Sequence, residues 1–192
     1  MRTRPALGES GFTLIDVLIS LFILAFGMLA LARVMAQSSL SEVEASQRSQ
    51  AIMLVQDMSE RINLNRKNAV AYVGNYSATW GPNGAADCSA MTGAEKVFLT
   101  DACEWQNLLA GSTTLDGTSA IGAPIAARGC VISPATNIYV IAVAWQGLVR
   151  TTSSDSACGA NAFDREDNRR VFSTVVQIAT LSDPLPPPPP GP

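Results

Sequence analysis

Residues 9–32 read ESGFTLIDVLISLFILAFGMLALA, and this stretch decides the fold of the chain. Counted from Phe12, it holds about twenty almost uninterrupted apolar residues, close to the number that a helix needs to cross roughly 30 Å of hydrocarbon. One acid, Asp16, lies near its beginning, although a charge in hydrocarbon costs several kcal/mol unless something neutralises it. The stretch therefore predicts a helix that leaves water, with a particular role for Asp16.

The residues before the apolar run carry two positive charges, Arg2 and Arg4. By the positive-inside rule they hold the N-terminus in the cytoplasm, so we expect the rest of the chain to be exported. A secretory signal peptide places its apolar region before the cleavage site, which small residues mark. Here the small residue Gly11 precedes the apolar run. A plain single-span membrane anchor is the simplest alternative reading.

The composition argues against several classes of function. The chain has 192 residues, of which 47% are hydrophobic and 15% charged, with a net charge of −3 and a pI near 4.9. An acidic chain is a poor match for nucleic acid. It contains no histidine, so the commonest general base and the commonest metal ligand are absent. We expect no catalytic site, metal site or cofactor.

The sequence GFTLIDVLIS, which begins at Gly11, closely resembles the processing site of type IV prepilins and pseudopilins, the class III prepilin signal. The resemblance implies that a membrane peptidase cuts after Gly11, which removes residues 1–11 as a leader peptide. It also implies that the new N-terminal amine, on Phe12, is methylated.

The same resemblance implies a role for Asp16, which occupies the position where that family normally has Glu. In the family's filaments, such a carboxylate can pair with the N-terminal ammonium of a neighbouring subunit. A pair of this kind can set register, because a misplaced partner leaves a buried charge unpaired. A local role is the alternative. Asp16 lies three residues after Thr13, and an acid near a helix N-terminus is favourable.

The helix is expected to continue far beyond the apolar run, from about residue 13 to about residue 65. After residue 32 the sequence becomes amphipathic, with helical spacing of the apolar residues Ile52, Leu54, Val55, Met58 and Ile62. A helix of this length measures on the order of 80 Å. Residues 12–33 would lie in the membrane or filament core, and the second half would pack on a globular domain. No proline lies between Pro5 and Pro82, so we expect no kink.

The remaining sequence predicts one more helix and a sheet. Residues 68–90 are predicted to form a loop, Thr92 and Glu95 have capping-box spacing, and Gly111 is a natural end for the helix that follows. Strands are predicted at residues 128–133, 137–148 and 171–181.

The middle predicted strand is apolar on both faces. Its larger residues are Tyr139, Ile141, Val143 and Trp145, and its smaller ones are Val140, Ala142 and Ala144. This pattern predicts a central strand, and the smaller residues would allow a helix to approach closely. The fold class is α+β, with the second half of the long helix on an antiparallel sheet.

All four cysteines, Cys88, Cys103, Cys130 and Cys158, follow the apolar segment. An even number of cysteines on the exported side predicts disulfides, and four cysteines allow three pairings. We favour Cys88–Cys103 and Cys130–Cys158, because each pair is formed by sequence neighbours that bracket a loop-rich stretch.

Several patterns outside the N-terminus narrow the resemblance. The chain contains RGC, then YVIAVAWQG, then CG, then DNRR before its last strand, and SQRSQAIMLVQDMSERINLNR in the long helix. Together they resemble the PilV branch of minor pilins, also called pilus modification proteins. This implies a pilus subunit that is not an enzyme, with a globular domain over residues 34–183.

The resemblance also implies partners and a location. The chain would span the inner membrane once, with its C-terminal domain in the periplasm, and would then enter a surface pilus. Its partners would be the processing peptidase and methyltransferase, other minor pilins and the major pilin, and a tip adhesin. The alternative is a pseudopilin of a type II secretion system.

Other candidate sites have simpler explanations. The acids Asp155, Asp164, Glu166 and Asp167 could bind calcium, but their spacing fits no EF-hand, and a solvated loop is favoured. The arginines Arg169 and Arg170 are interpreted as strand-edge charges, and the tryptophans Trp80, Trp105 and Trp145 as apolar anchors. The proline-rich tail, residues 184–192, is expected to form an extended polyproline II spacer.

Overall fold

The structure is a computed structural model of the chain, and it describes residues 13–77, 87–93, 95–112, 114–116 and 119–179. In chain order the elements are α1 (Leu14–Leu64), η1 (Arg66–Tyr72), β1 (Gly74–Ser77), η2 (Cys88–Ala90), α2 (Lys96–Leu109), β2 (Leu115–Asp116), β3 (Ser119–Ala120), β4 (Arg128–Ala135), β5 (Ile138–Gln146), η3 (Glu166–Asn168) and β6 (Arg169–Gln177). The predicted α+β class and the long N-terminal helix are confirmed.

The described residues belong to two compact units, of which one ends at Val43 and the other begins at Glu44. The described part of the first unit is almost entirely the first portion of α1. The second unit contains the rest of α1 and every other element. Helix α1 is continuous between Leu14 and Leu64, as expected for a segment without proline.

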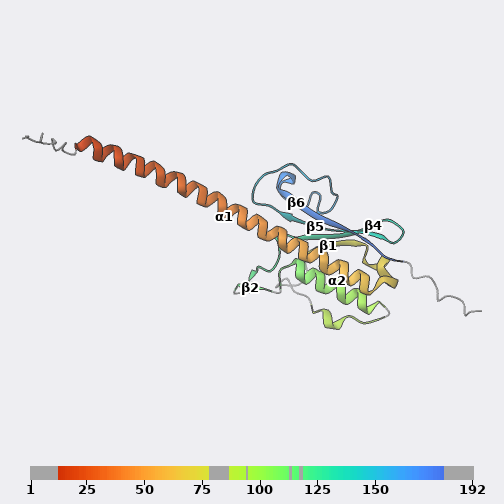
Figure 1. The fold of residues 1–192 in the computed structure, drawn as a ribbon. Coiled ribbons are helices and arrows are strands. Elements are labelled where there is room, and N and C mark those ends of the chain that lie inside the picture. Colours follow the sequence, from red (N-terminus) through yellow and green to blue (C-terminus); the bar gives the residue numbers. More distant parts are fainter. Residues whose placement is uncertain (1–12, 78–86, 94, 113, 117–118, 180–192) are drawn as a thin grey trace, which may run out of the picture. The chain divides into compact units, whose positions relative to one another are not determined.

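The sheet of the second unit has the strand order β1-β4-β5-β6, and every neighbouring pair is antiparallel (Figure 1). Strand β5 lies between β4 and β6, which confirms that the apolar stretch at residues 137–148 is a central strand. Strand β1 lies within residues predicted as loop. Its four residues GNYS carry little strand signal, and pairing with β4 from Gly74↔Val131 to Ser77↔Arg128 holds them extended.

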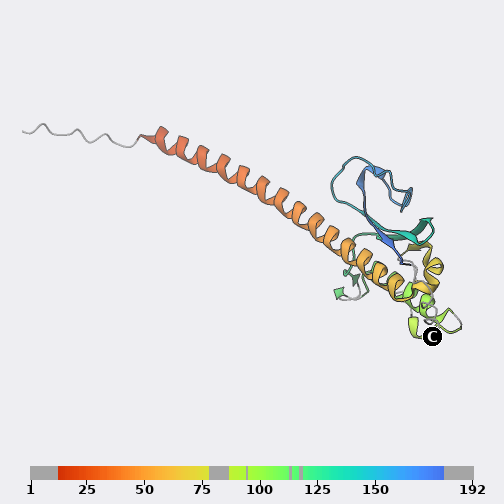
Figure 2. The same cartoon turned by 45° about the vertical axis from the view of Figure 1, so that its right-hand side comes forward.

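One face of the sheet packs against α1 and α2 to form the main core. The helix α1 buries Ala51, Leu54, Val55, Met58 and Ile62, and the sheet contributes Val131, Tyr139, Ile141, Val143 and Trp145. Figures 1 and 2 both show α2 alongside the C-terminal part of α1. Each fully buried aliphatic side chain contributes about 1.5–3 kcal/mol, so the helical stripe predicted from residue 52 to residue 62 anchors the helices to the sheet.

The opposite face of the sheet is covered by the loop between β5 and β6, residues 147–168. Here Ala142 and Ala144 pack with Cys130 and Cys158 in a second apolar cluster. The expectation that these small residues face a helix is therefore wrong. The helices lie on the face that carries the larger side chains, and the small residues leave room for a loop held by a disulfide.

Helix α2 begins later than its sequence signal suggested. Its N-cap is Glu95, which makes no capping hydrogen bond with its side chain, so the predicted capping box is not formed. The helix ends at Leu109, two residues before Gly111, the glycine at which the sequence predicted its end. That residue has a φ of +75°, and its N–H donates to the carbonyl oxygen of Leu108 at 2.9 Å.

Candidate functional site

The first candidate site is the apolar part of α1. Its large apolar side chains are exposed at almost every position from Leu14 to Met35, on all sides of the helix. By length and composition α1 could cross a membrane. A helix that is apolar all round is stable where hydrocarbon or other helices surround it, so this segment is built for a membrane or for a bundle.

Asp16 lies exposed in the first turn of this helix. Its Oδ2 accepts hydrogen bonds from the backbone N–H of Thr13 at 3.0 Å and from the Thr13 hydroxyl at 2.7 Å. The carboxylate therefore satisfies one donor at the helix N-terminus, which is the local role considered from the sequence. Its second oxygen, Oδ1, accepts no hydrogen bond from any described residue and is open to a partner.

The predicted cleavage site, Gly11 and Phe12, lies outside the described residues. Trp80 and the proline-rich tail at residues 184–192 lie outside them as well. Cleavage after Gly11 and methylation of Phe12 stay predictions from the sequence.

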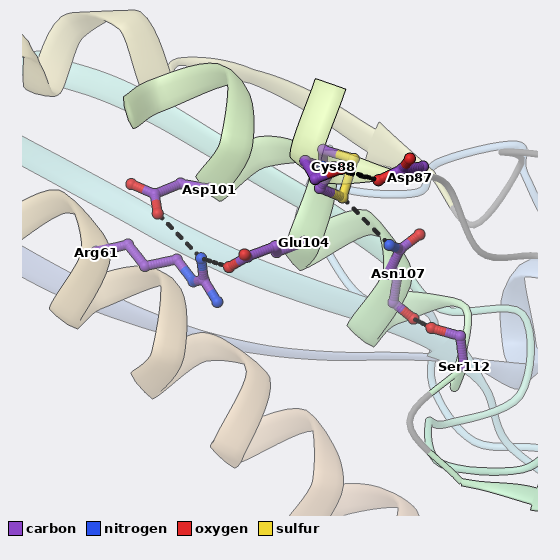
Figure 3. The surroundings of a disulfide bond; sticks show 9 residues. Arg61, Asp87, Cys88, Asp101, Glu104, Asn107 and Ser112 are labelled. Atoms are coloured by element: carbon purple, nitrogen blue, oxygen red, sulfur yellow. Dashed lines mark hydrogen bonds and ion pairs between the residues drawn. A yellow bond between two sulfur atoms is a disulfide. The ribbon is translucent and has the colours of Figure 1, made fainter. Parts of the chain in front are cut away.

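The structure contains both disulfides that the sequence favoured. Cys88 is bonded to Cys103, which ties η2 to α2, and Cys130 is bonded to Cys158. Figure 3 shows the first pair, where the side-chain amide of Asn107 donates to the sulfur of Cys88 at 3.3 Å. In the chain-entropy model a loop of about 15 residues gains roughly 3 kcal/mol from such a bond.

A network of charges that the sequence did not reveal joins α1 to α2 (Figure 3). The guanidinium of Arg61 donates to Asp101 at 3.0 Å and to Glu104 at 2.7 Å. It also donates to Asp57, on its own helix, at 2.7 Å. Burial alone would lower the pKa of Arg61, but these carboxylates outweigh burial and raise it. The hydroxyl of Tyr72 also donates to Asp101, and burial together with this carboxylate raises the pKa of Tyr72.

The second disulfide and Arg169 together shape the loop at residues 147–168. Arg169 is only 4% exposed. Its guanidinium donates to the backbone carbonyl oxygens of Ser154 at 2.8 Å, Ser156 at 2.7 Å and Cys158 at 2.9 Å. The interpretation of Arg169 as a strand-edge charge is therefore wrong, because its side chain is buried and holds the loop through hydrogen bonds. The sequence shows no pattern for this role, since the three partners of Arg169 within the loop are backbone carbonyl groups.

Two of the acids considered for calcium are engaged by arginines. Glu166 accepts from Arg169 at 2.6 Å and from the backbone N–H of Asn161 at 2.7 Å, and these bonds lower its pKa. Asp167 accepts two hydrogen bonds from Arg165, which lower its pKa in the same way. In the described part of the chain, no group of three or more His, Cys, Asp or Glu side chains could hold a metal ion.

Comparison with known proteins finds a similarity to one family over part of the chain. Residues 35–103 match the family model described as Tt1218-like, type IV pilin Tt1218. The matched segment runs from α1 through η1 and β1 to Cys103 in α2. No curated protein and no solved structure matches the chain. Together with the fold, the match supports the type IV pilin superfamily.

Proposed function

We propose that this chain, a pilin-like protein of the type IV pilin superfamily, is a minor pilin: a structural subunit, not an enzyme, that helps to start pilus assembly. The observation that carries the proposal is the apolar part of α1. It exposes large apolar side chains at almost every position from Leu14 to Met35. Such a segment suits storage in the inner membrane and later bundling with the same segment of other subunits.

Three further observations support a pilin role. The family match covers the C-terminal part of α1 and the segment that follows it. The sequence GFTLIDVLIS, which resembles the class III prepilin signal, runs from Gly11 into the first turns of α1. The globular unit carries two disulfides, which suit an exported domain. The finer assignment, to the PilV branch with a place in a tip complex that displays an adhesin, rests on the sequence patterns alone.

Asp16 supplies the proposed assembly contact. Cleavage after Gly11 would create a new amine on Phe12, which is positively charged at neutral pH. One oxygen of Asp16 is open in the single chain, so it can accept a hydrogen bond from that amine in a neighbouring subunit. A buried pair of this type favours one register over others, since a shifted neighbour leaves both charges unpaired.

The test of the prepilin assignment is Gly11→Ala in the full chain. We expect the variant to accumulate as uncleaved precursor, measured by mass spectrometry of the N-terminus. The matched control is Gly8→Ala, a glycine inside the leader but away from the cut, which should be cleaved normally. Normal maturation of Gly11→Ala would sink the proposal.

A deletion strain separates the pilus from the alternative, a pseudopilin of a type II secretion system. Both classes share the processing signal, so the apolar helix does not distinguish them. We expect the deletion to reduce surface pili and to leave secretion of exoproteins intact. Normal piliation together with lost secretion would favour the pseudopilin.

A further inference from the structure

A groove of about 480 Å³ lies between the start of the globular part of α1 and the β5–β6 side of the sheet. It belongs wholly to the unit that begins at Glu44. Its lining includes Glu44, Ala45 and Arg48 of α1, with Trp145, Arg170 and Phe172 of the sheet. Two arginines and one glutamate give the groove one excess positive charge, in a chain whose net charge is −3.

The glutamate of this groove, Glu44, already has hydrogen-bond partners within the chain. Glu44 Oε1 accepts from the backbone N–H groups of Leu148 at 3.2 Å and Val149 at 3.0 Å, and from the guanidinium of Arg170 at 3.3 Å. An acid four residues before an arginine ordinarily pairs with it on a helix surface. Here Glu44 turns to the loop after β5 instead, so Arg48 is left without it.

Arg48 is therefore the arginine of the groove whose charge no described residue neutralises. It is exposed, and it forms no hydrogen bond or ion pair with any residue that the structure describes. Arg170 is different, because its guanidinium also donates to Val149 and Thr151. A free guanidinium beside the apolar walls formed by Trp145 and Phe172 suits a planar carboxylate, which it can bind through two parallel hydrogen bonds.

We propose that this groove binds a carboxylate-bearing segment of another pilin subunit, with Arg48 as its charge partner. The proposal rests on the proposed function. Charge complementarity favours an acidic partner. Arg48 also lies on the same continuous helix as the apolar part of α1, thirteen residues beyond Met35, and thirteen residues span about 20 Å of helix. A subunit whose own helix runs alongside α1 over this length therefore brings its residues within reach of Arg48.

The first experiment uses Arg48→Lys, which keeps the charge and supplies an amine. A carbodiimide joins such an amine directly to a carboxylate with which it forms an ion pair. Sheared pili from cells carrying the full-length variant are treated and digested, and peptides containing the introduced lysine are identified by mass spectrometry. We expect a covalent link from this lysine to an Asp or Glu of a different pilin.

The matched control is Arg66→Lys, an exposed arginine outside the groove, which should give no such link. The inference would be overturned if, with the Arg48→Lys variant present in the pili, the introduced lysine gave no link at all, or links only to its own chain or to a second copy. Absence of even the wild-type chain from pili would overturn the proposed function, and this inference with it.

The second experiment reverses the charge with Arg48→Glu. We expect its recovery in sheared pili to fall about tenfold, because like charges would then meet in the groove. Arg48→Lys should restore recovery. The thermal unfolding of purified Arg48→Glu in detergent should match that of wild type, since Arg48 has no partner within the described chain. Unchanged recovery of Arg48→Glu would overturn the inference.

Discussion

Gly129 of β4 packs against the indole ring of Trp105 in α2, so close that a Cβ atom at Gly129 would overlap Cη2 and Cζ3 of the ring. The ring is fully buried, and its Nε1 donates a hydrogen bond of 2.9 Å to the carbonyl oxygen of Leu54 in α1. One side chain thus joins both helices to the sheet, and glycine is required where the ring meets the strand.

Gly129→Ala should lower the free energy of unfolding by about 1–3 kcal/mol, the usual cost of overpacking a core. The ring cannot withdraw without giving up its bond to Leu54. Urea denaturation of the purified protein in detergent measures the effect. Gly74→Ala in β1 is the control, because a Cβ there meets nothing within 4 Å; it should change the value by less than about 0.5 kcal/mol. Equal effects of the two variants would contradict this account.

Arg169→Met should release the loop at residues 147–168. The variant keeps an apolar stem but leaves the carbonyl oxygens of Ser154, Ser156 and Cys158 without their donor, so we expect a loss of about 2–4 kcal/mol. Compared with wild type, the variant should show faster amide hydrogen exchange in this loop, while exchange in α1 should change less.

The control for Arg169→Met is Arg165→Met. That arginine is exposed and its side chain bonds only to Asp167 among the described residues, so its removal should leave stability nearly unchanged. Unchanged exchange in Arg169→Met, or equal exchange in the two variants, would show that Arg169 does not hold the loop.

The contrast between Arg169 and Arg48 shows where sequence reasoning stops. The apolar run, the helical spacing up to Ile62 and the alternation in β5 are periodic, so they predicted α1 and the central strand. The disulfide pairs were also predicted from a local feature, since each joins two cysteines that are neighbours in the sequence. The role of an arginine depends instead on which backbone groups the fold brings to it. DNRR and SQRSQ look equally like surface, yet Arg169 is buried and Arg48 is free of partners among the described residues.

Size alone also misled the assignment of the sheet's faces. Ala142 and Ala144 leave space, and either a helix or a loop can fill such space. What decides between them is the bond from Cys130 to Cys158, which brings the loop to that face. Strand β1 was missed for a related reason, because its hydrogen-bonding partner β4 lies more than fifty residues away in the sequence.

Stability at high pH should depend on Tyr76. Burial raises the pKa of Tyr76 to about 12, and its hydroxyl donates to the carbonyl oxygen of Tyr72 at 2.6 Å. In the unfolded chain a tyrosine titrates near pH 10. The unfolded state therefore loses this proton first, so the contribution of Tyr76 is complete below about pH 10 and is lost as the pH rises toward 12.

Tyr76→Phe is the variant that checks this pH dependence. It should cost about 1 kcal/mol at pH 7, because the hydrogen bond is lost. Between about pH 10 and 12 its melting temperature should fall less steeply than that of wild type. Parallel curves for the two proteins would mean that Tyr76 does not titrate differently in the folded state.

The role of Asp16 can be separated into charge and helix capping by three variants. Asp16→Asn keeps an acceptor for the Thr13 N–H and removes the charge, whereas Thr13→Val removes one hydrogen bond to Asp16 and leaves the charge. If the carboxylate pairs with the ammonium of a neighbouring subunit, Asp16→Asn should lower recovery in sheared pili about tenfold. Thr13→Val and Asp16→Glu should assemble normally. Normal assembly of Asp16→Asn, with a defect in Thr13→Val, would instead leave Asp16 with helix capping alone.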